Sequence, residues 1–136
     1  MPLTEPRHVI LVAPADFVSD CVGYGVARLP DDRPLPPMQE GDRLVFYTPR
    51  TSARSGDRLE AFTAIGRVTA HASPPPVAYI AEASPAPIRP LLSRLDLTRL
   101  LGDQWEEALK EGSITVNAAD FAVIARAMGA ADSLAS

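Results

Sequence analysis

The residues with the greatest chemical capacity stand together at the end of an apolar segment. The sequence RLVFYTPR places Tyr47, Thr48, Pro49 and Arg50 directly after three apolar residues. Tyrosine can stack on a base, threonine can hydrogen-bond to a base edge, and arginine can bind a phosphate. A strand end at the mouth of a barrel is a common ligand site. Two interpretations stay open: Tyr47 and Arg50 contribute to a binding site, or Tyr47 packs under a helix and Arg50 is a solvated loop residue.

A second candidate feature is the arginine-bearing loop that follows. Arg50, Arg54 and Arg58 share a polar stretch with one acidic residue, Asp57. The net charge of the chain is −4, which excludes a strongly basic protein that coats DNA. A local basic patch on an acidic protein can still contact phosphates. The loop therefore predicts either a phosphate-facing surface or an ordinary solvated one.

Motifs of known catalytic sites are absent from the sequence, which contains no nucleophile elbow, P-loop, dinucleotide-binding fingerprint or HExxH metal motif. One cysteine and two histidines cannot build an ordinary zinc site. We expect His8 and His71 to be exposed or edge residues and Cys21 to be a small core residue. The pair Asp31-Asp32 is expected in a solvated loop. The sequence therefore predicts a non-catalytic protein without a cofactor.

A strand is expected to carry the candidate cluster. Its side chains alternate incompletely, with Leu44 and Phe46 on one face and Val45 and Tyr47 on the other. This pattern is typical of a strand in a closed sheet with a helix outside it. Because proline cannot donate a hydrogen bond to a neighbouring strand, we expect Pro49 to end the strand.

Other strands are expected to surround that one. The predicted strands are Val9–Ala13, Gly25–Leu29, Arg43–Thr48, Leu59–Ala70, Val77–Ala81 and Ile114–Val116. The first is rich in β-branched residues, which indicates a strand buried on both faces that ends at Pro14. Gly66, in the longest strand, indicates a bulge or a close approach of another backbone segment. The proline-rich and acidic stretch at 30–41 is expected to be an irregular loop.

Helices are expected between and after the strands, at Ala15–Val22, Ile88–Leu95, Leu97–Lys110 and Ala118–Met128. Asn117 is a suitable N-cap for the last helix, whose apolar stripe consists of Phe121, Ile124, Ala125 and Met128. Trp105 lies beside several leucines, so we expect it to anchor the core instead of stacking on a ligand. Strands interleaved with helices predict an α+β domain built as a small barrel with helices around it.

Four segments carry a resemblance to a known family. They are GDRLVFYTPR at 41–50, LEAFTAIGRV at 59–68, PIRPLLSRL at 87–95 and ADFAVIARAM at 119–128. In order and spacing they resemble the EVE domain family of the PUA-like superfamily, and VILVAP and GYGVA near the N-terminus match its beginning. The resemblance covers residues 8–128. It implies a PUA-like pseudo-barrel of five to six curved strands, with surrounding helices and a C-terminal helix.

The resemblance also implies a function. PUA-like proteins bind RNA or modified bases, and EVE domains read modified nucleotides, so a nucleotide or a nucleic acid such as DNA is the implied partner. Tyr47, Thr48 and Pro49 match a tyrosine followed by serine-proline in the family, and Thr63 lies in the well-matched AFTAIG segment. The nucleotide-binding candidates are Tyr47, Thr48, Pro49, Arg50, Thr63 and Arg28.

Two departures from the family pattern support an alternative function. Val9 stands where the family usually has a tryptophan, and Arg28 begins a segment that is shorter and more acidic than its counterpart. An acidic loop would oppose a phosphate, and the missing tryptophan would weaken stacking. The alternative is a divergent protein-interaction or regulatory module that has lost the nucleotide pocket and binds a protein partner.

The ends of the chain and its apolar runs bear on location. The N-terminal residues have no apolar signal segment, and the apolar run at 9–15 is too short to span a bilayer. We therefore expect a cytoplasmic protein without membrane contact. A single domain is expected at 8–129, between a flexible N-terminus at 1–7 and a flexible tail at 130–136.

Overall fold

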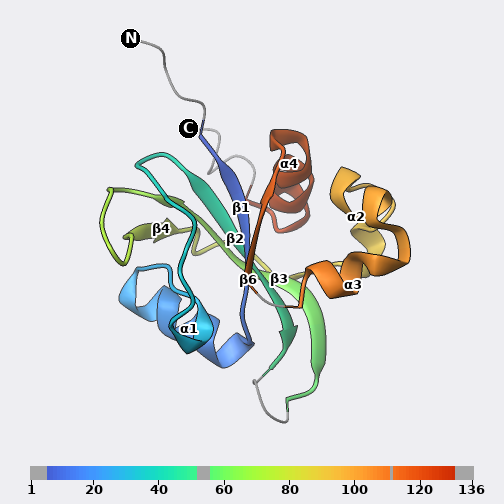
Figure 1. Ribbon diagram of the computed structural model, residues 1–136, viewed down its shortest axis with the longest axis horizontal. Coiled ribbons are helices and arrows are strands. Elements are labelled where there is room, and N and C mark those ends of the chain that lie inside the picture. The colour runs from blue at the N-terminus through green and yellow to red at the C-terminus, as the bar shows by residue number, and fades with distance from the viewer. Residues whose placement is uncertain (1–5, 52–55, 111, 131–136) are drawn as a thin grey trace.

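The computed structural model describes residues 6–51, 56–110 and 112–130, which form one mixed sheet with helices on both faces (Figure 1). The strands are β1 (His8–Val12), β2 (Arg43–Arg50), β3 (Arg58–Val68), β4 (Val77–Tyr79), β5 (Ala86–Pro87) and β6 (Gly112–Val116). Their order is β4-β3-β2-β1-β6, with β5 paired to β3. The α+β class is therefore confirmed, whereas the described strands form an open sheet whose edges are β4 and β6.

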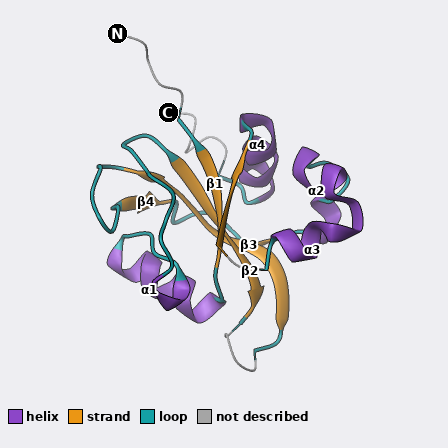
Figure 2. Cartoon of the chain, in the orientation of Figure 1, coloured by secondary structure: helices purple, strands orange, loops and turns teal. Residues whose placement is uncertain are grey.

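In the described part of the chain, four α-helices cover the two faces of this sheet (Figure 2). They are α1 (Ala15–Tyr24), α2 (Asp96–Leu101), α3 (Trp105–Ala108) and α4 (Ala118–Ala127), with 3-10 turns at Pro30–Asp32, Arg89–Leu91 and Gly102–Gln104. One hydrophobic core lies under α1 and the other lies under α3 and α4. None of the helices that the structure describes is long and apolar enough to cross a membrane.

The alternation predicted for β2 is confirmed. Leu44 and Phe46 belong to the core under α1, whereas Val45 and Tyr47 belong to the opposite core. All residues of β1 are buried, as expected for a strand with a packed core on each face. This burial includes His8, whose ring lies 5.0 Å from that of Phe121, so the expectation of an exposed or edge histidine was wrong. β1 is an interior strand between β2 and β6, which encloses its first residue.

The strand predicted at Gly25–Leu29 does not form. In its place, Val26 makes an isolated bridge to Pro76, and the Ala27 N–H donates to the Pro75 carbonyl at 3.0 Å. The two prolines of the partner segment have no N–H to donate, so the pairing cannot extend into a ladder. The helix before it runs two residues further than predicted, to Tyr24, and ends at Gly25 in the left-handed region.

The predicted end of β2 at Pro49 was also wrong. The strand continues to Arg50, which pairs with Arg58, and the register shifts between Thr48 and Arg50. This irregularity lets the strand pass a proline without the missing hydrogen bond. By contrast, the close approach predicted at Gly66 is confirmed, because a Cβ there would lie 2.7 Å from the Ala78 carbonyl oxygen.

The region of two predicted helices at 88–110 is divided into short pieces. A 3-10 turn precedes α2, and Gly102, with φ +58, separates α2 from the turn before α3. The N–H groups of Asp96 and Leu97 at the start of α2 donate to the Asp120 carboxylate at 2.7 and 2.9 Å. A cap supplied from α4 is a tertiary contact, and no local pattern at residue 96 indicates it.

The C-terminal helix agrees with its prediction. The Asn117 Oδ1 accepts a hydrogen bond from the Asp120 N–H at 2.7 Å, as an N-cap should. The apolar stripe predicted for this helix is buried in the core beside β1 and β6. Ala130 is buried in the same core, so the packed part of the chain includes this first residue of the predicted tail. Residues 1–5 and 131–136 lie outside the described residues.

Candidate functional site

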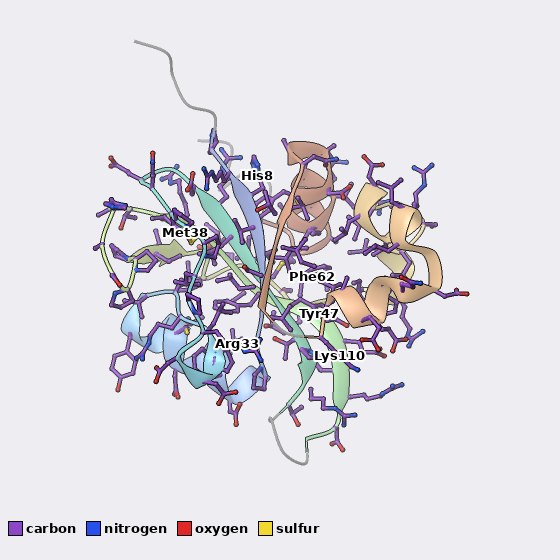
Figure 3. All side chains as sticks on the ribbon, in the orientation of Figure 1. His8, Arg33, Met38, Tyr47, Phe62 and Lys110 are labelled. Carbon is purple, nitrogen blue, oxygen red and sulfur yellow. The ribbon has the colours of Figure 1, made fainter. Side chains whose placement is uncertain are left out.

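A cavity of about 510 Å³ lies where four strand ends meet. Because β1 and β2 are parallel, their carboxyl ends lie at the same edge of the sheet. β3 and β6 run antiparallel to these strands, so their first residues lie at that edge too. Tyr47, Arg33 and Lys110, which line the cavity, lie towards this end of the molecule in Figure 3. The topology of the sheet therefore creates the site.

Tyr47 places a hydroxyl at the cavity while its ring packs in the core. The residue is 2% exposed, and its ring meets that of Phe62 edge-on at 5.5 Å. The hydroxyl forms no hydrogen bond within the described part of the chain. Its oxygen is not completely enclosed by the protein, so it can be reached by a ligand. Burial, and then the nearby carboxylates of Glu60 and Glu106, raise the pKa of Tyr47. The hydroxyl thus stays protonated at neutral pH and is available to a ligand, whereas the ring face is not.

Four basic residues also line the cavity: Arg33, Arg50, Arg58 and Lys110. Arg50 and Arg58 are exposed cross-strand neighbours on β2 and β3. Arg50 Nη1 donates to the Gly56 carbonyl at 3.2 Å, a bond that leaves its other N–H groups for an anion. Arg54, the third arginine of the predicted loop, lies outside the described residues.

Four acidic residues balance these charges: Asp31, Glu60, Glu106 and Glu107. Arg89 Nε and Nη2 donate to the two oxygens of Glu60, each at 3.2 Å, and Arg89 Nη2 lies 3.8 Å from Glu106. Lys110 is paired with Glu107 at 3.2 Å. The rim therefore carries both positive and negative charges, and most of its carboxylates form ion pairs with basic side chains of the same chain.

Arg89 joins the wall of the cavity to the core. Its guanidinium carbon lies 5.8 Å from the centre of the Trp105 ring, within the range of a cation–π contact. Trp105 is buried at the start of α3, which confirms that it anchors the core. The hydrogen bonds to Glu60 raise the pKa of Arg89, so it remains charged. One side chain thus connects β3, α3 and the cavity wall.

Two of the predicted site residues are placed away from this cavity by the alternation of the strands. Thr48 is fully buried, and its Oγ1 lies 2.7 Å from the Oγ1 of Thr63 in a hydroxyl pair. Neither residue lines the cavity, whereas Tyr47, Pro49 and Arg50 do. Arg28 lines a neighbouring cavity and is paired with Asp32 at 3.6 Å. The structure therefore brings three of the six candidates together.

Comparison with known proteins places the chain in a family. It is 37% identical to UPF0310 protein msl3206 of Mesorhizobium japonicum over 115 residues, which cover 75% of this chain and 76% of the relative. It is 35% identical to a UPF0310 protein of Mycobacterium avium, covering 67% and 73%. UPF0310 protein YdcG of Bacillus subtilis is 29% identical, covering 93% and 89%. The chain belongs to the UPF0310 family. No family model matches it.

The sequence of this UPF0310 chain contains a signal for one cavity residue that was not among the predicted site residues. Glu60 stands between Leu59 and Ala61 in a strand, where its charge interrupts an apolar run. Its φ is +49, a conformation that is costly for a residue with a side chain. The role of Arg89 could not be predicted from the sequence, because Arg89 reaches Glu60 only in the folded chain. A charged residue inside an apolar strand is the kind of signal that indicates a site.

Two further groups bear on the chemistry of the UPF0310 chain. Cys21, a residue of α1, is buried in the core as predicted, and burial raises the pKa of its thiol. The thiol is therefore protonated at neutral pH and is a weak nucleophile. Among residues 6–51, 56–110 and 112–130, no group of three or more potential ligands could hold a metal ion. What the cavity offers is a protonated hydroxyl, a mixed-charge rim and apolar walls.

Proposed function

We propose that this chain binds a nucleotide unit in the cavity at the strand ends and acts as a non-catalytic reader of nucleic acid, with modified bases among its ligands. The observation that carries the proposal is the combination of an unpaired Tyr47 hydroxyl at a cavity wall with two exposed arginines at its rim. The resemblance to EVE domains agrees with it, and we extend the proposal to a PUA-like origin of the curved sheet.

The size and walls of the cavity fit a planar heterocycle. Small-molecule sites commonly measure about 300–1,000 Å³, and this one has about 510 Å³. Three proline rings and the side chain of Leu109 give it apolar surfaces. A base would therefore pack between proline and leucine, with its polar edge at the Tyr47 hydroxyl. This arrangement takes the place of stacking on the Tyr47 ring, which was one of the two interpretations left open by the sequence.

The charges at the rim fit a phosphate once the internal pairs are counted. Glu60 and Glu106 face Arg89, and Glu107 faces Lys110. Within the described residues, Arg50 and Arg58 form no ion pair with a carboxylate. Arginine binds phosphate in a planar, two-pronged geometry. A phosphate attached to the bound unit would reach these two side chains at the rim.

A binding screen tests the proposal. Fluorescence anisotropy at a stated salt concentration would compare oligonucleotides with modified and unmodified bases. We expect Tyr47→Phe to keep the fold, because only one hydroxyl is removed, and to weaken binding about 5- to 10-fold, since a hydrogen bond contributes about 1 kcal/mol. We expect Arg50→Gln to lower the slope of log affinity against log salt by about 0.7–0.9.

Arg94→Gln is the matched control, because Arg94 is exposed and lines neither cavity. Absence of binding to every oligonucleotide would overturn the proposal. The four carboxylates of the rim favour the alternative function, a protein-interaction module that has lost the nucleotide pocket. That alternative requires Tyr47→Phe and Arg50→Gln to change no nucleic-acid affinity at all.

A further inference from the structure

A second cavity of about 680 Å³ adjoins the first. Arg33 lines both cavities, and the 3-10 turn Pro30–Asp32 lies between them, with Asp31 at the first and Asp32 at the second. In Figure 3, Arg33 lies towards the end of the molecule that holds Tyr47, and Met38, which lines the second cavity, lies towards the other end. The second cavity therefore leads away from the first along the α1 side of the sheet.

The walls of the second cavity are rigid and largely apolar. Five prolines contribute to them: Pro34, Pro36, Pro37, Pro74 and Pro75. Proline fixes φ, so these walls lose little conformational freedom when a ligand binds. His71 Nδ1 donates to the Met38 carbonyl at 2.9 Å, a bond that joins the two segments flanking the cavity. The cavity is thus formed in advance by backbone geometry.

The charged groups of the second cavity favour an anionic ligand. Arg28 and Arg33 face it against one carboxylate, that of Asp32. The Arg28–Asp32 pair is 3.6 Å long, and its side chains are 59% and 94% exposed. Exposed pairs of this kind contribute little, so a phosphate can take the place of Asp32 at small cost. Arg28 can therefore pair with a phosphate of a phosphodiester backbone.

We propose that the second cavity holds the nucleotide next to the one bound in the first, so that the ligand is a single-stranded or locally opened polynucleotide instead of a free mononucleotide. This inference rests on the proposed function of the first cavity. The turn Pro30–Asp32 separates the two nucleotide units, and Arg33 lies at the junction, where the linking phosphodiester passes. Proline rings contact the apolar faces of the sugar and base, and Arg28 contacts the next phosphate.

Affinity as a function of ligand length tests this inference. Isothermal titration would compare a nucleoside monophosphate with single-stranded oligonucleotides of two to four units. We expect affinity to rise at least tenfold from one unit to three. Arg28→Gln should reduce oligonucleotide affinity several-fold and lower the salt slope by about 0.7, the value for one contact to a single strand. Its effect on the monophosphate should be nil.

Two variants control for charge and position. Arg28→Lys keeps the positive charge and should restore most of the salt slope, whereas Arg94→Gln should behave as the wild type. The inference is overturned if oligonucleotides bind no more tightly than the monophosphate, or if Arg28→Gln affects both ligands equally. If the monophosphate binds while either of these two results is found, the inference fails but the proposed function stands. If neither ligand binds, the proposed function fails as well.

Discussion

Replacing Gly66 with alanine adds one methyl group at a point where β3 and β4 approach closely. The new Cβ would lie 2.7 Å from the Ala78 carbonyl oxygen, 2.7 Å from Val77 Cγ1 and 3.0 Å from Tyr79 Cα. Two of these three atoms belong to the backbone, so a side-chain rotation cannot relieve the contact. β4 must move away from β3, which draws the buried Val77 out of the core under α1.

The cost follows from this geometry. Overpacking in a well-packed core destabilises proteins by about 1–3 kcal/mol. The upper part of that range applies here, because the displaced group is a hydrogen-bonded strand. At about 2–3 kcal/mol, and about 3–5 °C for each kcal/mol in a chain of this size, we expect a fall in Tm of about 6–15 °C. Urea unfolding followed by circular dichroism would give the free energy directly.

Gly23 provides the matched control. It lies within α1, and a Cβ there would meet nothing within 4 Å. Gly23→Ala should therefore stabilise the protein by about 0.5–1 kcal/mol through helix propensity and reduced freedom of the unfolded chain. The two identical substitutions must change stability in opposite directions. Equal effects, or a neutral Gly66→Ala, would show that β3 and β4 are not packed as described.

Three further predictions concern the scaffold. Asp120→Ala should lower the free energy of unfolding in urea by about 2–4 kcal/mol, because two N–H groups at the start of α2 lose a charged acceptor. As a control, the same substitution at the exposed Asp103 should leave that free energy unchanged. Phe121→Ala should cost about 3–5 kcal/mol, and a Tm equal to that of the wild type would refute the core contact of α4. Burial raises the pKa values of Tyr47 and Tyr79, so above about pH 10 the unfolded chain loses protons that the folded chain keeps, and stability should fall as pH rises. Tyr79→Phe should reduce this decline, whereas a decline of the same size in that variant would assign it to other groups.

The core of the fold could be predicted from the sequence because local signals and burial agree there. β1, the two faces of β2 and the capped C-terminal helix follow from side-chain alternation, β-branching and an N-cap. The division of the 88–110 region could not be predicted in this way. Its helices end and begin through Gly102 in the left-handed region and through the Asp120 carboxylate, a group 24 residues distant from Asp96. Tertiary contacts of this kind override helix propensity.

The sites where local rules fail gather around the cavity. The pairing of β2 with β3 is irregular at Pro49, and the backbone φ angles of Asp31 and Glu60 are positive. All three residues line the cavity. Each such conformation costs about 1–3 kcal/mol, so the surrounding structure must hold it in place. For Glu60, that support is visible: Arg89 fixes its carboxylate, and the Ile88 N–H donates to its carbonyl at 2.9 Å. Strained conformations cluster at ligand sites, so the strain at this end of the sheet supports the proposed binding site independently of any resemblance.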